Sequence, residues 1–131
     1  MEARNTQQLD LRDEIYARAV ISHDCSHPGD IVGLDALKAY YQGSHEGLPD
    51  FKGENDEVLA AGDKIVLRWT ITGTHTGTLR GLPPTNKRVE FSGIALCQIA
   101  DGKIVEEWVY FNVLDLFQQL GFSLVPPGST A

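Results

Sequence analysis

The sequence has few cysteines and no long hydrophobic run. Its two cysteines, Cys25 and Cys97, stand far apart without a CxxC pattern, so in a reducing compartment we expect free thiols and not a disulfide or a metal pair. The apolar runs, such as residues 93–97, are far shorter than the ~20 residues of a membrane helix. Residues 1–8 lack the basic start and apolar middle of a signal peptide, which predicts a cytoplasmic protein without a membrane partner.

Basic residues are also in the minority. There are 11 Lys and Arg against 18 Asp and Glu, a formal net charge of −7. An acidic surface of this size repels phosphate backbones, so nucleic acid is not expected as a partner. The length of 131 residues, with 42% hydrophobic and 22% charged residues, is typical of one globular domain. We therefore expect a single domain over residues 1–131.

Helical spacing of apolar residues occurs in three places. It predicts an amphipathic helix over residues 6–19, a second helix after Gly33 and a short third one over residues 113–120. Small polar residues with a Pro-Gly pair predict a loop over residues 22–30.

The middle of the chain alternates with period two. Ile65, Leu67, Trp69 and Ile71 share one face of a half-buried strand. The predicted strands cover residues 57–60, 65–72, 88–99 and 104–111. Residues 76–86 hold too many glycines and prolines for regular structure and predict a wide connection, whereas Asp101-Gly102 predicts a tight hairpin.

Helices followed by an antiparallel meander predict an α+β fold. We expect a curved antiparallel sheet, a cone or half-barrel, covered by the N-terminal helices. Gly73 and Gly93 lie inside strand patterns, where glycine often marks a bulge or a sharp bend. The inward side chains of the strands would then line a hollow that the helices close.

Five separate segments carry a resemblance to a known family. They are Ala61-Gly62-Asp63-Lys64-Ile65-Val66, Thr72-Gly73-Thr74-His75-Thr76-Gly77, Gly81-Leu82-Pro83-Pro84-Thr85, Asp101-Gly102-Lys103-Ile104-Val105-Glu106-Glu107-Trp108 and Gln118-Gln119-Leu120-Gly121. In this order and spacing, over roughly residues 34–121, they resemble the SnoaL-like polyketide cyclase and ester cyclase family, which has the nuclear transport factor 2-like fold. The resemblance implies a deep apolar pocket and, in characterised members, cofactor-free and metal-free ring closure of a polyketide ester by aldol condensation.

The resemblance also implies a catalytic carboxylate four residues after the tryptophan that corresponds to Trp108. Here that position is Asn112, whose amide can orient a carbonyl or a water but cannot take a proton at neutral pH. Strand parity puts Trp108, Tyr110 and Asn112 on one side, which we expect to face the pocket. On this basis Asn112→Asp is predicted to create or raise cyclase-like proton exchange.

His75 and Asp50 are the candidate acid/base groups. The phase of the strand from Ile65 to Ile71 carries His75 to the inward face, where a neutral imidazole can act as base or donor. The alternative is a structural histidine bonded to a loop backbone. Asp50 matches the family's Pro-Asp pair, and its alternative role is that of a turn former accepting backbone N–H bonds.

Aromatic side chains are the candidate pocket lining. Trp69, Trp108, Tyr110 and Tyr41 are predicted to contact the ligand. Of Glu106 and Glu107, which lie on opposite faces by parity, at most one points inward, and Glu106 is expected to bond within the fold, because an unpaired buried carboxylate is costly.

A short cluster of possible metal ligands lies near the N-terminus. His23, Asp24, Cys25 and His27 are close in sequence, but a metal site needs ligands that converge in space, and their side chains alternate in direction. No metal and no cofactor are expected.

These observations favour a protein that binds an apolar, carbonyl-bearing small molecule. If it is an enzyme, we expect cyclisation or isomerisation by cofactor-free general acid/base proton transfer, with His75 or Asp50 as the base and Asn112 orienting the carbonyl oxygen. Two alternatives stay open: a non-catalytic binding module, and an epoxide or ester hydrolase in which Asn112 helps to hold a water. A homodimer that pairs through the outward sheet face, near Thr70 and Thr72, is also expected.

Overall fold

The computed structural model describes residues 12–128, which form helices and one sheet. In chain order the elements are α2 (Arg12–Ile15), β1 (Tyr16–Asp24), β2 (Ile31–Val32), α3 (Leu34–Gly47), β3 (Lys52–Ala61), β4 (Lys64–Thr74), β5 (Arg88–Ala100), β6 (Lys103–Phe111) and α4 (Val113–Gln119). None of these helices is long and apolar enough to cross a membrane.

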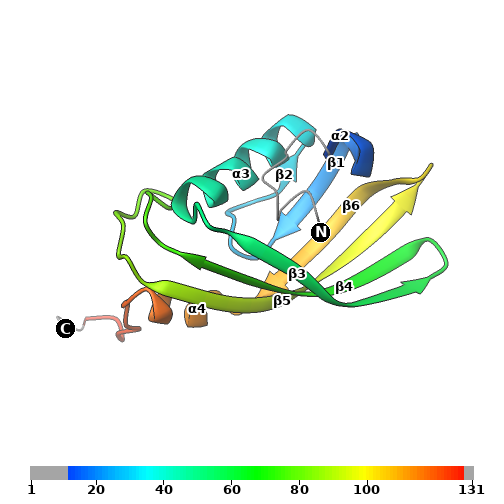
Figure 1. Ribbon diagram of the computed structural model, residues 1–131. Helices are drawn as coiled ribbons and strands as arrows, with labels where there is room; N and C mark the ends of the chain where they lie inside the picture. Colours follow the sequence, from blue (N-terminus) through cyan, green and yellow to red (C-terminus); the bar gives the residue numbers. More distant parts are fainter. Residues whose placement is uncertain (1–11, 129–131) are drawn as a thin grey trace.

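The strands form one twisted sheet in the order β2-β1-β6-β5-β4-β3 (Figure 1). The meander from β3 to β6 pairs antiparallel, as predicted, whereas β1 pairs parallel to β6. The helix α3 lies over one face of the sheet, and α4 lies near the start of β5 (Figure 1). The α+β class is therefore confirmed. The sheet is mixed because the chain passes from β1 through α3 to the far edge before it returns.

The first predicted helix is largely wrong. Residues 6–11 lie outside the described part of the chain, only Arg12–Ile15 is helical, and Tyr16–Asp24 is a strand. Tyr16 and Val20 are both buried four residues apart, which imitates helical spacing, because the pairing with β6 shifts register between Tyr16 and Ile21. Backbone pairing with β6 outweighs the local helical pattern.

The two predicted connections of the meander are confirmed. Asp101 and Gly102 have φ angles of 52° and 76°, as a type I′ hairpin turn requires. The longer connection between β4 and β5 contains a second tight turn at its tip, in which Arg80 and Gly81 have φ angles of 49° and 80°. This turn sets the direction of the Arg80 side chain.

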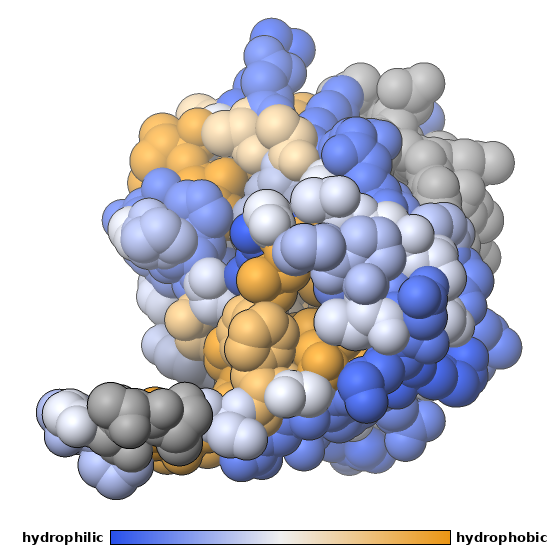
Figure 2. Space-filling view, turned by 90° about the vertical axis from the view of Figure 1, so that its left-hand side faces the viewer, coloured by the Kyte–Doolittle hydropathy of each residue, from blue (hydrophilic) through white to orange (hydrophobic). Residues whose placement is uncertain are grey.

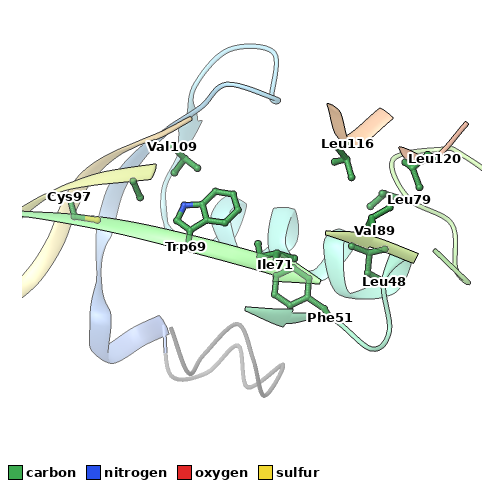
Figure 3. Close-up of a cluster of buried hydrophobic side chains, with 11 residues drawn as sticks. Leu48, Phe51, Trp69, Ile71, Leu79, Val89, Cys97, Val109, Leu116 and Leu120 are labelled. Carbon is green, nitrogen blue, oxygen red and sulfur yellow. The ribbon is translucent and has the colours of Figure 1, made fainter. Parts of the chain in front are cut away.

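The inner face of the sheet forms the main core, with Trp69 near its centre (Figure 3). Gly93 is not at a bulge: the register between β4 and β5 is continuous there, and Gly93 pairs with Trp69. A Cβ atom at Gly93 would lie 2.4 Å from Cζ2 of Trp69. The glycine thus leaves room for the indole. Pairing continues across Gly73 as well, and the meander shifts register between Asn55 and Glu57 and between Gln98 and Ile99.

Candidate functional site: an apolar cavity with one polar end

A cavity lies between the inner face of the sheet, α3, the β4–β5 connection and α4. Its volume is about 70 Å³, which is room for several water molecules. Most of its lining is apolar, including Leu48, Phe51, Trp69, Ile71, Val109 and Leu116. Figure 2 shows the end of the molecule at which α4 and the β4–β5 connection meet, where hydrophobic surface lies between hydrophilic flanks.

Four polar side chains gather at one end of this cavity. Asp24 ends β1, Ser26 follows in the next turn, Tyr40 stands on α3, and Arg80 comes from the tip of the β4–β5 connection. Asp24 is 8% exposed. Segments far apart in the sequence therefore supply a carboxylate, a hydroxyl, a phenol and a guanidinium to one place.

The hydrogen bonds between these four groups form a series in which each group donates to the next, from Arg80 to Asp24. Ser26 Oγ donates to Asp24 Oδ1 at 2.6 Å. Because this bond uses the only hydroxyl proton of Ser26, the 2.9 Å bond between Ser26 Oγ and the Tyr40 hydroxyl must be donated by Tyr40. Arg80 Nη2 donates to the Tyr40 oxygen, and Arg80 Nη1 donates to the Ser26 carbonyl at 3.0 Å. The hydrogen-bond series therefore leads from the Arg80 guanidinium through the hydroxyls of Tyr40 and Ser26 to the Asp24 carboxylate.

Tyr40 is held in its neutral form. Burial raises the pKa of its hydroxyl, the negative charge of Asp24 raises it further, and Arg80 opposes both. The Arg80 guanidinium also lies over the Tyr40 ring, 4.9 Å from its centre, within the range of a cation–π contact. Tyr40 is thus a protonated donor at neutral pH.

Asn112 does not face the cavity, contrary to the prediction. It is exposed and precedes α4 as the N-cap, where its Oδ1 accepts a 2.9 Å bond from the backbone N–H of Asp115. Strand parity did group Trp108 and Tyr110 on one side of β6, but that side is the outer face of the sheet and not the face toward the cavity. The inward positions of β6 are those of Glu107, Val109 and Phe111.

Trp108 and Tyr110 lie on the outer face for the same reason. Tyr110 is 61% exposed, and Trp108 stacks on His23 with ring centres 5.3 Å apart. Neither ring lines the cavity, so the predicted inward position of Trp108 and Tyr110 is wrong. Trp69 and Tyr41 do line the cavity.

Of the two adjacent glutamates, Glu107 is the inward one. It is 1% exposed and accepts bonds from the Tyr16 hydroxyl at 3.0 Å and from Ser22 Oγ at 2.7 Å. Glu106 bonds within the fold as expected, to His23 Nε2 at 2.6 Å. Both carboxylates thus have partners on β1.

His75 is fully buried at the start of the β4–β5 connection. Thr85 N–H donates to its Nδ1 at 3.3 Å, and Thr85 Oγ1 lies 3.0 Å from the same nitrogen. A backbone N–H can only donate, so Nδ1 is an acceptor and the proton is on Nε2. His75 is not among the residues that line the cavity. This geometry resembles the structural alternative, in which the imidazole bonds to a loop backbone.

Asp50 is exposed and joins the start of β3 to the end of β4. Its carboxylate accepts bonds from Thr74 N at 2.6 Å and from Thr74 Oγ1 at 2.8 Å. These bonds lower the pKa of Asp50. The structure does not bring Asp50, His75 and Asn112 together, and none of them lines the cavity.

The possible metal ligands near the N-terminus do not converge. His23 bonds to Asp30 and Glu106, and Cys25 Sγ contacts the backbone of Phe111. Within residues 12–128 no group of three His, Cys, Asp or Glu side chains is arranged to hold a metal ion.

Sequence reasoning missed three groups of the polar end and misjudged the fourth. Asp24 was weighed only as a metal ligand, and Ser26, Tyr40 and Arg80 were not considered. Tyr40 and Arg80 carry no local pattern that points to a site. The one local signal was Gly81, since glycine readily adopts the positive φ of a tight turn.

The fold is α+β, and it encloses a mostly apolar cavity with one polar end. The SnoaL-like polyketide cyclase family matches residues 1–120, and this chain belongs to that family.

Several solved structures are similar to this chain. AclR, a proposed hydroxylase from Streptomyces galilaeus, is 28% identical with a TM-score of 0.80, covering 96% of this chain and 79% of AclR. IdmH, a proposed polyketide cyclase from Streptomyces antibioticus, is 25% identical with a TM-score of 0.79, covering 92% of both chains. TsrD from Streptomyces laurentii is 24% identical with a TM-score of 0.82, covers 91% of this chain and 87% of TsrD, and supports the fold alone. No curated protein sequence matches.

Proposed function

We propose that this protein binds an apolar, carbonyl-bearing small molecule in the cavity and moves a proton on it without a cofactor. The observation that carries the proposal is the gathering of Asp24, Ser26, Tyr40 and Arg80 at one end of a mostly apolar cavity. An apolar pocket with a few convergent polar groups is the usual form of a small-molecule site. Such a pocket buries the body of the ligand and fixes the orientation of its polar end.

Arg80 is the group suited to hold the carbonyl oxygen. A guanidinium has five N–H donors, and Arg80 donates one to Ser26 and one to Tyr40. The remaining donors can bind a carbonyl oxygen and stabilise the negative charge that forms on it.

Asp24 is the group suited to take the proton. In the proposed step its carboxylate removes a proton from the carbon next to the carbonyl. The electron pair of the broken C–H bond forms the carbon–carbon double bond of an enolate, whose negative charge rests on the oxygen beside Arg80. Isomerisation returns the proton from Asp24 to another carbon. In cyclisation the enolate carbon bonds to a second carbonyl carbon, whose oxygen takes the proton.

The test uses 4-phenylbutan-2-one, an apolar ketone, dissolved in D₂O with the purified protein. NMR follows the exchange of the protons next to the carbonyl for deuterium. We expect the wild-type protein to accelerate this exchange, and Asp24→Asn to reduce the acceleration by about 10²-fold or more. Asp35→Asn, which removes an exposed carboxylate in the first turn of α3, is the matched control and should exchange like the wild type.

Two other outcomes of the exchange experiment would favour a different base or a non-catalytic protein. Loss of exchange in Asp50→Asn together with normal exchange in Asp24→Asn would move the base to Asp50, which with His75 was one of the two candidates from the sequence. Background exchange in the wild-type protein, with the ketone still bound, would favour the binding module. That alternative has an observation of its own, since Asn112 stands at the position where the resemblance implies a carboxylate and lies outside the cavity.

The homodimer stays part of the proposal. Ile94 and Tyr110 are partners in register on the outer face and are 48% and 61% exposed. Arg68 on the neighbouring strand is paired with Asp56 and Glu57. We expect sedimentation equilibrium to show a dimer, and Tyr110→Glu to shift it toward the monomer. A monomeric wild-type protein would contradict this expectation.

A further inference from the structure

The cavity wall contains a buried hydrogen-bond donor without a partner. Trp69 is 1% exposed and lines the cavity, and its Nε1–H has no hydrogen-bond partner within the described residues. Leaving a buried donor unpaired costs about 1–3 kcal/mol, and most buried polar groups in native proteins are paired. An unpaired N–H in a cavity wall is therefore a candidate ligand contact.

The surrounding structure fixes the position of the indole. Phe91 and Phe111 contact the Trp69 ring edge-on, with ring centres 6.0 Å and 5.8 Å away. Gly93 lies beneath the ring, and a side chain there would collide with it. These neighbours are apolar and offer the indole nitrogen no acceptor side chain. A phenylalanine at position 69 would keep aromatic contacts of this kind without the buried donor.

Val109 is the labelled neighbour on the nitrogen side of the indole (Figure 3). In Figure 3 the nitrogen edge of Trp69 lies on the side of Val109 and away from Leu116. Val109 also lines the cavity and is in register with Asp24. Between β4 and β1 there are three strand spacings, on the order of 14 Å between backbones. Trp69 and Asp24 both line the cavity.

We infer that Trp69 recognises a second oxygen atom of the ligand, which accepts a hydrogen bond from the indole Nε1–H. This inference rests on the proposed function, in which Arg80 holds the first oxygen. The ligand class is then an apolar compound with two oxygen functions a few bonds apart, such as a dicarbonyl. Trp69 selects such a compound over an analogue with one oxygen, because the analogue leaves the buried donor unpaired.

The first experiment compares four probes with one carbon skeleton: 1-phenylbutane-1,3-dione, 1-phenylbutan-1-one, 4-phenylbutan-2-one and butylbenzene. We expect the dione to bind the wild-type protein about tenfold more tightly than either monoketone, a difference of about 1.4 kcal/mol. In Trp69→Phe this preference should fall below about twofold, whereas the affinity for butylbenzene should change little. An undiminished preference in a folded Trp69→Phe protein would overturn the inference.

The second experiment needs no variant at position 69. The chain has two tryptophans, so its indole region in a proton–nitrogen NMR spectrum holds two N–H signals, and Trp108→Phe identifies that of Trp69. We expect the dione to shift the Trp69 signal downfield and to slow its exchange with solvent, whereas butylbenzene should do neither. An unmoved signal, or a magnetisation transfer showing a trapped water on this N–H in the dione complex, would overturn the inference.

These results separate the inference from the proposed function. If no ketone binds, or if Arg80→Gln binds every ketone as the wild type does, the proposed site itself is wrong. If the ketones bind and depend on Arg80 while the Trp69 signal is unaffected, only the role of Trp69 is wrong.

Discussion

At the scale of single residues, Asn112 has a structural task that the resemblance did not suggest. Its side chain caps α4 through the backbone N–H of Asp115, and such a cap contributes about 0.5–2 kcal/mol to stability. The pattern was visible in the sequence, because an asparagine followed by an acidic residue three positions later is typical of a helix start. It competed with the strand parity of Trp108 and Tyr110 and was overlooked.

This placement reverses the predicted effect of Asn112→Asp. Aspartate caps a helix as well as asparagine does, and its charge suits a helix N-terminus. We therefore expect Asn112→Asp to leave proton exchange on 4-phenylbutan-2-one unchanged, and Asn112→Ala to lower the free energy of unfolding by about 1 kcal/mol, measured in urea. A gain of exchange in Asn112→Asp would show that residue 112 reaches the bound ligand and would restore the original prediction.

At the scale of elements, the close contact between α3 and the β4–β5 connection positions Arg80. Gly77 N–H donates to the Gly47 carbonyl at 3.2 Å, and a Cβ atom at Gly77 would lie 1.9 Å from the Glu46 carbonyl oxygen. No side chain fits there without movement of the backbone. The glycine is thus required for the approach of the connection to the end of α3.

We expect Gly77→Ala to push the connection away from α3 and to displace Arg80. The variant should lose both stability and affinity for 4-phenylbutan-2-one, measured by urea denaturation and by titration with the ketone. Gly43→Ala is the matched control, because a Cβ at Gly43 meets no atom within 4 Å. In the interior of α3 this change should raise stability by roughly 0.5–1 kcal/mol. Normal affinity in Gly77→Ala would mean that Arg80 does not depend on this contact.

At the scale of the whole molecule, His23 on β1 contacts both the loop that leads to β2 and the neighbouring strand β6. Its Nδ1 lies 2.8 Å from Asp30, its Nε2 lies 2.6 Å from Glu106, and its ring stacks on Trp108. Only the protonated imidazole can donate to both carboxylates. The bond to Glu106 raises the pKa of His23, burial opposes this rise, and Asp30 adds to it.

The sign of the pH dependence follows from this raised pKa. The stabilisation is fully present below the unfolded value of about 6.5, and it is lost as the pH rises through the higher folded-state pKa. We expect the urea midpoint to fall over this range, and His23→Gln to flatten the fall. NMR titration of the His23 ring gives the folded-state pKa directly. A value below 6.5 would contradict the prediction. Because these side chains are partly exposed, added salt should weaken the effect.

The sequence by itself determined the meander and its connections. Alternation over Ile65, Leu67, Trp69 and Ile71 and the Asp101-Gly102 turn are local signals, because strand period and turn conformation depend on residues next to one another in the chain. The motif order over residues 61–121 likewise determined the family, which the match over residues 1–120 confirmed.

Only the tertiary structure decided which face of β6 is inward and which groups meet in the cavity. Each face of β6 carries one glutamate and at least one aromatic residue, and β1 supplies the hydrogen-bond partners of the inward Glu107. Asp24, Tyr40 and Arg80 come from three elements distant in the sequence. Their meeting depends on long-range packing, which no spacing along the chain encodes.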